Sequence, residues 1–172
     1  MKILGIDPGI NHLGYACLEK VLQGFQVKAW GTISPPEDFS LPQKLAFIFE
    51  ELKQIIITFN PDFLAVEEVF TRGSGSSTLK LSQAQAIILL LSGLYNLRVK
   101  TFNPKEIKSF LTQNGNAKKK DMMNRINLLI QQGFLSFAEK SEGIKLDSHR
   151  VDALSVALFL SFEVGGKGCF SV

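Results

Sequence analysis

KILGIDPGINHLGYACLEK, residues 2–20, sets the first two elements of the chain and the turn between them. Its apolar beginning predicts a buried strand that ends at Asp7, and Pro8 and Gly9 are turn residues. The apolar residues that resume at Leu13 predict a second strand, so the stretch should form a hairpin. Asp7 is then fixed where a strand turns over. A single acid at such a corner could also be a solvated turn residue.

Further elements follow from the periodicity of the apolar residues. Three antiparallel strands come first, and helices and strands alternate after them, which predicts an α/β fold: a five-stranded mixed sheet with helices on both faces. In this layout the first and fourth strands can be neighbours at the centre of the sheet. Beyond the hairpin, we expect strands at 25–33, 63–69 and 97–102 and helices at 41–59, 78–95, 105–111, 118–132 and 149–162, with a variable loop before the last helix.

Length and composition favour one domain. The chain has 172 residues, of which 45% are hydrophobic, and this suits a single globular unit with a substantial core. We assign residues 1–164 to that domain and expect 165–172 to be a flexible tail. The sequence shows neither a membrane span of about 20 apolar residues nor a secretory leader, so we expect a cytoplasmic protein with no membrane partner.

The charge is unevenly distributed. The formal net charge is only +3, but residues 98–125 hold eight basic and two acidic side chains, so this segment carries +6 and the remainder −3. A segment this basic is typical of a surface that faces a polyanion, because lysines that neutralise phosphates release condensed counterions. The alternative is an ordinary solvated helical face.

Two further acidic motifs join Asp7. The stretch FLAVEEVF, residues 63–70, is an apolar strand that ends in Glu67 and Glu68, and SHRVDALSVALFL, residues 148–160, begins a helix with His149 and Asp152. Three separate elements thus each place an ionisable group at one end. Side chains alternate along a strand, so only one of Glu67 and Glu68 can lie on the same face as Asp7.

Carboxylates that cluster repel one another and raise one another's pKa unless a cation lies between them. A cluster of acids from the three elements therefore predicts a metal site. Oxygen ligands favour hard cations such as magnesium or manganese, and two such ions are the usual arrangement for phosphodiester hydrolysis. His149 lies one helical turn before Asp152 and on the same face, where it could bind metal, move a proton or stabilise the transition state. It could also be an ordinary surface residue.

Together, GIDPG (5–9), AVEEVF (65–70) and HRVDAL (149–154) resemble the RuvC-type Holliday junction resolvases of the RNase H-like superfamily. The resemblance extends through LKLSQAQA (79–86) and FNPKEIKSFL (102–111). It implies a metal-dependent, structure-selective endonuclease that resolves four-way DNA junctions by symmetric phosphodiester hydrolysis in recombination and repair. It also implies a homodimer and a branch-migration motor complex as a further partner.

The resemblance implies roles for individual residues. The metal-binding and catalytic set falls on Asp7, Glu67, His149 and Asp152, with Mg²⁺ or Mn²⁺ as the cofactor and two ions per site. Phe70 becomes the aromatic residue that stacks on a junction base. The candidate DNA contacts are Phe70, Arg72, Lys80, Lys105, Lys108, Lys118, Lys119 and Lys120. The chain departs from the family at 113–116, where Asn116 replaces a frequent arginine.

Two competing interpretations belong to other classes. A catalytically silent module could keep the sheet and the basic segment and bind junctions without cutting them. An actin-like or sugar-kinase-like nucleotide-binding fold also begins with a similar hairpin. Such proteins need two domains around the nucleotide, and this chain has the length of one and shows no Gly-rich phosphate loop. The helix around 87–91 is apolar on more than one face, so it is either internal or covered by a partner subunit.

Overall fold

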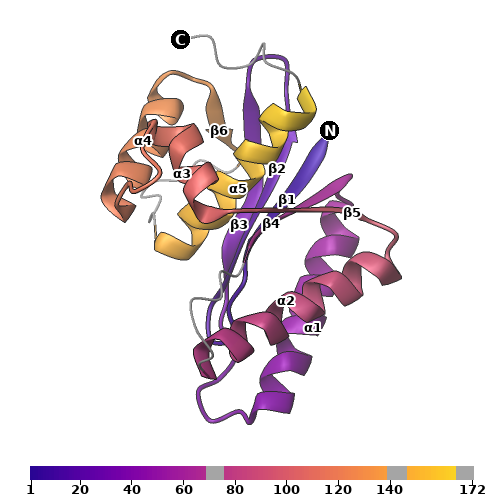
Figure 1. Cartoon of the computed structure of the whole chain (residues 1–172). Coiled ribbons are helices and arrows are strands. Elements are labelled where there is room, and N and C mark those ends of the chain that lie inside the picture. Colours follow the sequence, from indigo (N-terminus) through magenta and orange to yellow (C-terminus); the bar gives the residue numbers. More distant parts are fainter. Residues whose placement is uncertain (69–75, 139–146, 166–172) are drawn as a thin grey trace.

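The centre of the structure is a mixed sheet with strand order β5-β4-β1-β2-β3-β6 (Figure 1). The computed structural model describes residues 1–68, 76–138 and 147–165. The strands are β1 (Lys2–Asp7), β2 (Leu13–Lys20), β3 (Phe25–Ile33), β4 (Phe63–Glu67), β5 (Arg98–Phe102) and β6 (Leu135–Phe137). The helices are α1 (Leu41–Phe59), α2 (Ser76–Leu94), α3 (Pro104–Thr112), α4 (Lys119–Gln131) and α5 (Ser148–Gly165).

The neighbours of β1 determine where the acids lie. β1 pairs antiparallel with β2, and Asp7 stands opposite Gly14. On its other side β1 runs parallel to β4, with Ile6 beside Val66. The carboxyl ends of β1 and β4 therefore lie at the same end of the sheet. This confirms the predicted adjacency of the first and fourth strands.

The predicted count of five strands is wrong, because a sixth strand was not anticipated. β6 lies in the stretch predicted as a loop and runs parallel to β3, with Phe25 beside Leu135. The amide of Phe25 also donates to the carbonyl of Phe134 at 2.8 Å. Three residues are too few to show a strand periodicity, and the pairing stabilises β6 only because the edge of β3 is open to it.

Two hydrophobic cores lie on opposite faces of the sheet. In Figure 1, α5 with α3 and α4 covers one face, and α1 with α2 covers the other. Along β1, Ile3 belongs to the core under α5, whereas Leu4 and Ile6 belong to the core under α1 and α2. Side chains alternate between the faces of a strand, so Gly5 and Asp7 face the α5 side.

Close contact with the sheet explains the position of α5. A Cβ atom added to Gly5 would lie 2.1 Å from the carbonyl oxygen of Ala153. Only glycine at this position lets the helix backbone approach β1 so closely. The helix is apolar and buried along most of its length, and its buried serines satisfy their hydroxyls within the helix, as in the bond from Ser155 Oγ to the Val151 carbonyl at 2.6 Å.

Local hydrogen bonds define the first turns of α3 and α4. Asn103 precedes α3 and accepts a hydrogen bond from the amide of Lys105, as a helix N-cap does. The amide of Lys118 donates to the carboxylate of Asp121 at 2.9 Å at the start of α4. These contacts hold Lys105 at the start of α3 and Lys118 at the start of α4. Among the described helices, none combines the length and apolar character needed to cross a bilayer.

Candidate active site

Three elements bring the predicted residues to one end of the sheet. Asp7 ends β1, Glu67 ends β4, and His149 and Asp152 lie in the first turns of α5. α5 packs against β1, β2 and β4. A Cβ atom on Gly14 would lie 2.2 Å from the carbonyl oxygen of His149, so glycine in β2 allows the start of α5 to lie directly on the sheet.

The strand alternation decides between the two glutamates. Leu64 and Val66 belong to the core under α1 and α2, and Ala65 belongs to the core under α5. Glu67 therefore faces the side of α5, together with Asp7, while Glu68 does not. Glu68 is exposed, and its amide donates to the carbonyl of Phe102. The sequence had left this choice open apart from the resemblance.

Asp7 and His149 form a direct contact. Their atoms Oδ2 and Nδ1 lie 2.8 Å apart in a partly buried position, and the carboxylate accepts the ring N–H. Burial raises the pKa of Asp7, and the hydrogen bond and charge of His149 oppose that rise. The contact fixes the orientation of the imidazole and leaves Nε2 as its second functional atom.

The other two acids have strongly raised pKa values. Burial raises the pKa of Glu67 to about 8, and repulsion from Asp7 and Asp152 adds to the rise. Burial and the charge of Asp7 raise the pKa of Asp152 to about 6. Lys119 lowers both values, as does Lys108. Carboxylates that repel one another at this strength share one electrostatic environment.

A cavity of about 530 Å³ lies at this end of the sheet. It collects Asp7, His149 and Asp152 from two elements, and Lys80 from α2 and Lys119 from α4 add positive charge to its wall. Glu67 is not among the lining residues. The full lining is Asp7, Pro8, Gly9, Ile10, Asn11, His12, Lys80, Leu81, Lys119, His149 and Asp152.

The donor set suits a hard cation. Three carboxylates and an imidazole supply the oxygen and nitrogen ligands that magnesium and manganese accept. Burial and mutual repulsion disfavour the ionised forms of Glu67 and Asp152, and a bound cation would favour them. Within the described residues, no three His, Cys, Asp or Glu side chains are arranged closely enough to hold one ion as they stand. Mutual repulsion opposes a tighter grouping of ionised carboxylates.

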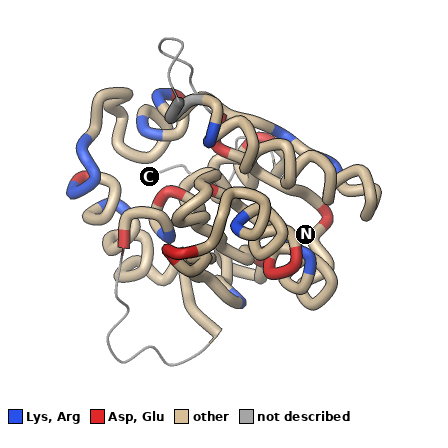
Figure 2. Tube along the Cα trace, turned by 90° about the horizontal axis from the view of Figure 1, so that it is seen from below, with Lys and Arg blue, Asp and Glu red and all other residues tan. Residues whose placement is uncertain are grey.

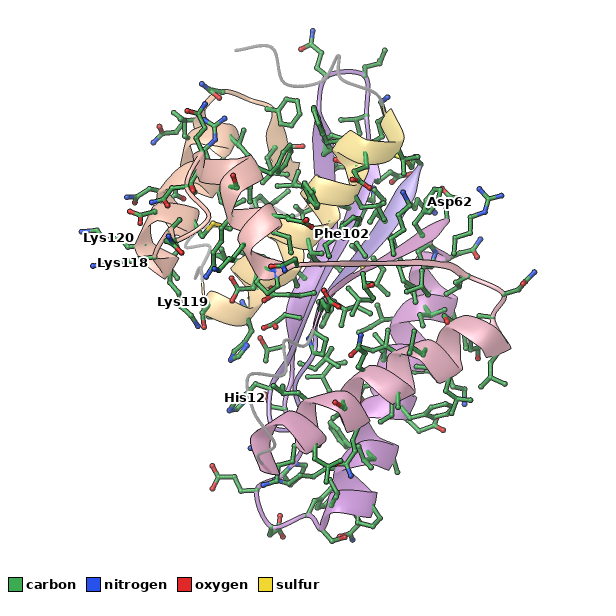
Figure 3. All side chains as sticks on the ribbon, in the orientation of Figure 1. His12, Asp62, Phe102, Lys118, Lys119 and Lys120 are labelled. Atoms are coloured by element: carbon green, nitrogen blue, oxygen red, sulfur yellow. The ribbon has the colours of Figure 1, made fainter. Side chains whose placement is uncertain are left out.

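The predicted DNA contacts fall into three groups. Lys80 and Lys119 line the cavity, and Lys108 acts electrostatically on Glu67 and Asp152. Figure 3 shows Lys118 and Lys120 extending away from the molecule, with Lys119 below them. In Figure 2 the longest run of basic positions lies at one edge of the molecule. Lys105, Lys118 and Lys120 are exposed outside the cavity, and Phe70 and Arg72 lie outside the described residues.

Sequence reasoning missed His12. It lies between β1 and β2 and lines the cavity, and its ring centroid is 5.7 Å from that of His149. The signal was present, because His12 belongs to the same turn as Asp7 and a cavity at the end of β1 must include that turn. Asn11 lies in the same turn, and its Oδ1 accepts a hydrogen bond from Lys44 at 3.0 Å.

Comparison with known proteins identifies the family. The family model for crossover junction endodeoxyribonuclease RuvC matches residues 3–159. The chain belongs to the RuvC family. It is 34% identical over 158 residues to the enzyme of that name from Dehalococcoides mccartyi, which covers 92% of this chain and 89% of that one. The enzyme of Brachyspira hyodysenteriae is 35% identical over 128 residues, or 74% of this chain and 80% of that one.

The fold agrees with this membership. A structure described as Thermus thermophilus RuvC in complex with Holliday junction substrate superimposes with a TM-score of 0.80 at 24% identity and covers 95% of this chain and 94% of that chain. The predicted RNase H-like α/β fold is thereby confirmed. Membership of the RuvC family also confirms the predicted enzyme class, a crossover junction endodeoxyribonuclease that resolves Holliday junctions.

Proposed function

We propose that the chain cuts opposite strands of a four-way DNA junction symmetrically, by metal-assisted phosphodiester hydrolysis at the end of β1. The observation that carries this proposal is that Asp7, Glu67 and Asp152 act electrostatically on one another beside a cavity to which Lys80 and Lys119 also contribute. Acids alone would repel a DNA phosphate. Acids that hold a cation, flanked by Lys80 and Lys119, would attract one.

The carboxylates of Asp7, Glu67 and Asp152 would hold two Mg²⁺ ions, or Mn²⁺ in their place. Such ions supply an activated water molecule and stabilise the leaving oxygen. Asp7 ends the central strand and Asp152 lies on a helix buried against it, so the main chain on both sides of the site is firmly held. Glu67 completes the set from the neighbouring strand and lies on the same face.

His149 would act in the site beside Asp7, either as a metal ligand or as a proton carrier. Its Nδ1 atom donates to Asp7, so Nε2 is the atom left to bind metal or to carry a proton. The bond also holds the imidazole in the wall of the cavity. In this arrangement Asp7 orients the imidazole, and Nε2 is the ring atom that would bind metal or carry a proton.

The basic residues would bind the arms of the junction. Lys80 and Lys119 lie closest to the reaction because they line the cavity. Lys105, Lys108, Lys118 and Lys120 lie on or before α3 and α4 and would neutralise phosphates farther along the DNA. Phe70 would stack on a base and Arg72 would bind the backbone, as the resemblance implies.

We further propose a homodimer that forms through α2. Ile88 and Leu91 of this helix are fully buried in the core, but Leu89, Leu90 and Leu94 are 49%, 55% and 62% exposed. The alternative of a fully internal helix is therefore wrong. Exposed leucines on one helix face form an apolar strip that a second subunit could cover. A two-fold dimer would offer two equivalent sites to the pseudo-two-fold junction.

Three predictions about context remain part of the proposal. Residues 1–164 would act as one domain, and 165–172 as a flexible tail. A branch-migration motor complex would work beside the dimer on the same junction. The DNA substrate would place the protein in the cytoplasm.

A labelled synthetic four-way junction tests the proposal. The protein should make paired, symmetric nicks in Mg²⁺ or Mn²⁺ and none in a chelator. Asp7→Asn should bind the junction but not cut it, because the amide cannot supply the anionic ligand. A wild-type protein that binds junctions and never nicks them in either metal would support the silent binding module, and nucleotide hydrolysis would support the kinase-like alternative.

A further inference from the structure

Both histidines of the chain line the same cavity. His149 comes from the start of α5, and His12 comes from the turn between β1 and β2. Their ring centroids lie 5.7 Å apart, and the ring planes are inclined by 34°. His149 already has a partner in Asp7, so the function proposed above accounts for its place. The position of His12 is not yet explained.

The ring of His12 is held in a defined orientation. Its Nδ1 atom lies 3.0 Å from Oγ of Ser34, which directly follows β3. The strand register explains this contact, because Leu13 pairs with Ile33 and their chain neighbours therefore meet. The turn is also tight, since a Cβ atom on Gly9 would lie 2.1 Å from the carbonyl oxygen of His12. The loop that carries the ring is thus closely constrained.

The other ring nitrogen is available to a ligand. His12 is exposed, and its Nε2 atom makes no hydrogen bond to any residue in the described part of the chain. When the Ser34 hydroxyl donates to Nδ1, the ring proton lies on Nε2 and makes that atom a donor. In that tautomer the ring combines a held orientation with an open N–H group in the wall of the cavity.

The surroundings favour an anionic ligand. Lys80 and Lys119 line the same cavity, and Figure 3 shows His12 and Lys119 on the same side of the molecule. His12 contacts His149, which in turn contacts Asp7. His149 therefore lies between His12 and the carboxylate assigned to the metal site. A DNA strand that passes through the cavity would bring an adjacent phosphate to this position.

We propose that His12 binds the DNA substrate by donating from Nε2 to a non-bridging oxygen of a phosphate that flanks the scissile one, with Ser34 positioning the ring. This inference rests on the proposed function of the cavity. The segment from the end of β1 into the β1–β2 turn would then have two functions. Asp7 would bind metal, and His12, five residues later, would position the DNA strand.

The competing explanation is purely structural: His12 would only pack against His149 and keep it beside Asp7. The two explanations differ in how His12 depends on the charge of the DNA. Loss of a packing contact lowers activity equally on every junction. Loss of a phosphate contact matters only where that phosphate carries its charged oxygens.

The experiment couples protein variants to modified DNA. Junctions are made with a neutral methylphosphonate at each phosphate that flanks the cut, one position at a time, and kcat/KM is measured for wild type and His12→Ala. At the contacted position, wild type should lose about 10- to 100-fold, the range expected for a hydrogen bond to a charged group. On unmodified DNA, His12→Ala should lose a similar factor in kcat/KM. On the junction modified at the contacted phosphate it should lose little more, and this non-additivity is the coupling between His12 and that phosphate.

Three further variants sharpen the result. Ser34→Ala should show a smaller loss with coupling at the same phosphate. His12→Gln, which keeps a side-chain N–H donor, should recover part of the coupling. Asn11→Ala is the matched control, because it alters the same turn without removing the ring, and it should show no coupling. Thermal melting of each variant checks that the fold is retained.

The dissociation constants of the same junctions, measured in the non-cleaving Asp7→Asn background, separate this inference from the proposed function. Coupling in Kd without cleavage by the wild type would keep His12 as a DNA contact and overturn the hydrolytic proposal. If the wild type cleaves the junction, and the effects of His12→Ala and of the methylphosphonate simply multiply at every flanking phosphate, the role of His12 is overturned and the hydrolytic proposal stands. Wild-type behaviour of His12→Ala on unmodified DNA would also overturn the role of His12.

Discussion

α5 and α2 are both long apolar helices, but they lie on opposite faces of the sheet and are covered to different degrees. α5 is buried from Val151 to Ser161 with few interruptions. α2 buries Ile88 and Leu91 but leaves neighbouring leucines open to solvent. Apolar composition alone therefore does not tell how a helix is used. The contacts of its neighbours decide whether it anchors a site within the subunit or offers a surface to another.

Glycines in and near the two helices show the same difference in how closely each helix is packed. Gly5 and Gly14 on the sheet allow α5 to come into close contact, and this contact sets the position of His149 and Asp152. For Gly93, inside α2, an added Cβ would have no atom within 4 Å apart from its chain neighbours and the backbone of its own helix. α5 therefore holds His149 and Asp152 in defined positions on the sheet, whereas α2 has open space beside Gly93.

The largest effect is expected at the start of α5. Asp152→Asn should lower cleavage of a four-way junction by more than about 100-fold, because loss of groups that only orient metal ligands already costs 10- to 100-fold. Binding of the junction should be retained. Glu163→Gln is the matched control, since Glu163 lies exposed at the other end of the same helix and should cut normally. Single-turnover rates with metal give the comparison, and a comparable rate for Asp152→Asn would remove that residue from the site.

The close contact under α5 is tested by Gly5→Ala. The added Cβ would lie 2.1 Å from the Ala153 carbonyl oxygen and 2.8 Å from the Ala157 Cβ, so the helix must shift. We expect a loss of about 1–3 kcal/mol in the free energy of unfolding, with slower cleavage because the first turn of α5 moves with the helix. Urea denaturation measures the first effect.

Gly93→Ala is the control on the other helix. It fills open space and replaces a helical glycine, so it should stabilise the protein by about 0.5–1 kcal/mol. Equal effects of the two substitutions would contradict the contrast between the helices.

The sequence was sufficient for the frame of the molecule. The strand that ends at Asp7, the helix that begins near His149 and the adjacency of the first and fourth strands all follow from local patterns and their order. β6 could not be found this way, because three residues carry no periodicity and its pairing depends on a distant edge. The acids were recognisable for the same reason as the frame: each ends or begins a strongly patterned element.

The remaining parts of the site depended on which faces pack together. The choice between Glu67 and Glu68 follows once Ala65 and Val66 are assigned to different cores. His12 has no periodic signal because it lies in a turn, and only the register of β2 and β3 shows that it meets Ser34. The covering of α2 was undecided because an apolar pattern on several faces is common to internal helices and to interfaces.

The open face of α2 gives the third prediction. Leu90→Glu should weaken the proposed dimer by about 10- to 100-fold, because association would bury a charged group without a partner. Sedimentation velocity over a range of concentrations measures the change. Leu22→Glu is the control, since Leu22 is fully exposed at the tip of the β2–β3 hairpin and its substitution should leave association unchanged. A wild-type protein that stays monomeric at micromolar concentrations would disprove the dimer through α2.

The acids beside α5 give the fourth prediction, a dependence of stability on pH. Burial raises the pKa of Glu67 from 4.5 to about 8, so between these values the folded protein binds more protons than the unfolded chain. The free energy of unfolding of the metal-free protein should therefore fall as pH rises across this window, by at most about 1.4 kcal/mol per unit for this group. Glu67→Gln should flatten the slope, and Mg²⁺ should restore stability most at the alkaline end. A metal-free protein equally stable at pH 6 and pH 8 would contradict the raised pKa.

The smallest effect compares one lysine from each side of the cavity. Lys119 begins α4, which packs on the α5 side, and Lys80 belongs to α2. If each neutralises one phosphate, Lys119→Ala and Lys80→Ala should each reduce the slope of log K against log salt by about 0.9. Lys28→Ala is the control, because that residue pairs with Glu19 at the opposite end of the sheet and should leave the slope unchanged. A loss of slope for Lys119→Ala alone would mean that the DNA follows the α4 side of the cavity and does not contact α2. A loss of slope in both variants would mean that one DNA strand passes between the two helices, so that the helix of the proposed dimer interface would also contact the substrate.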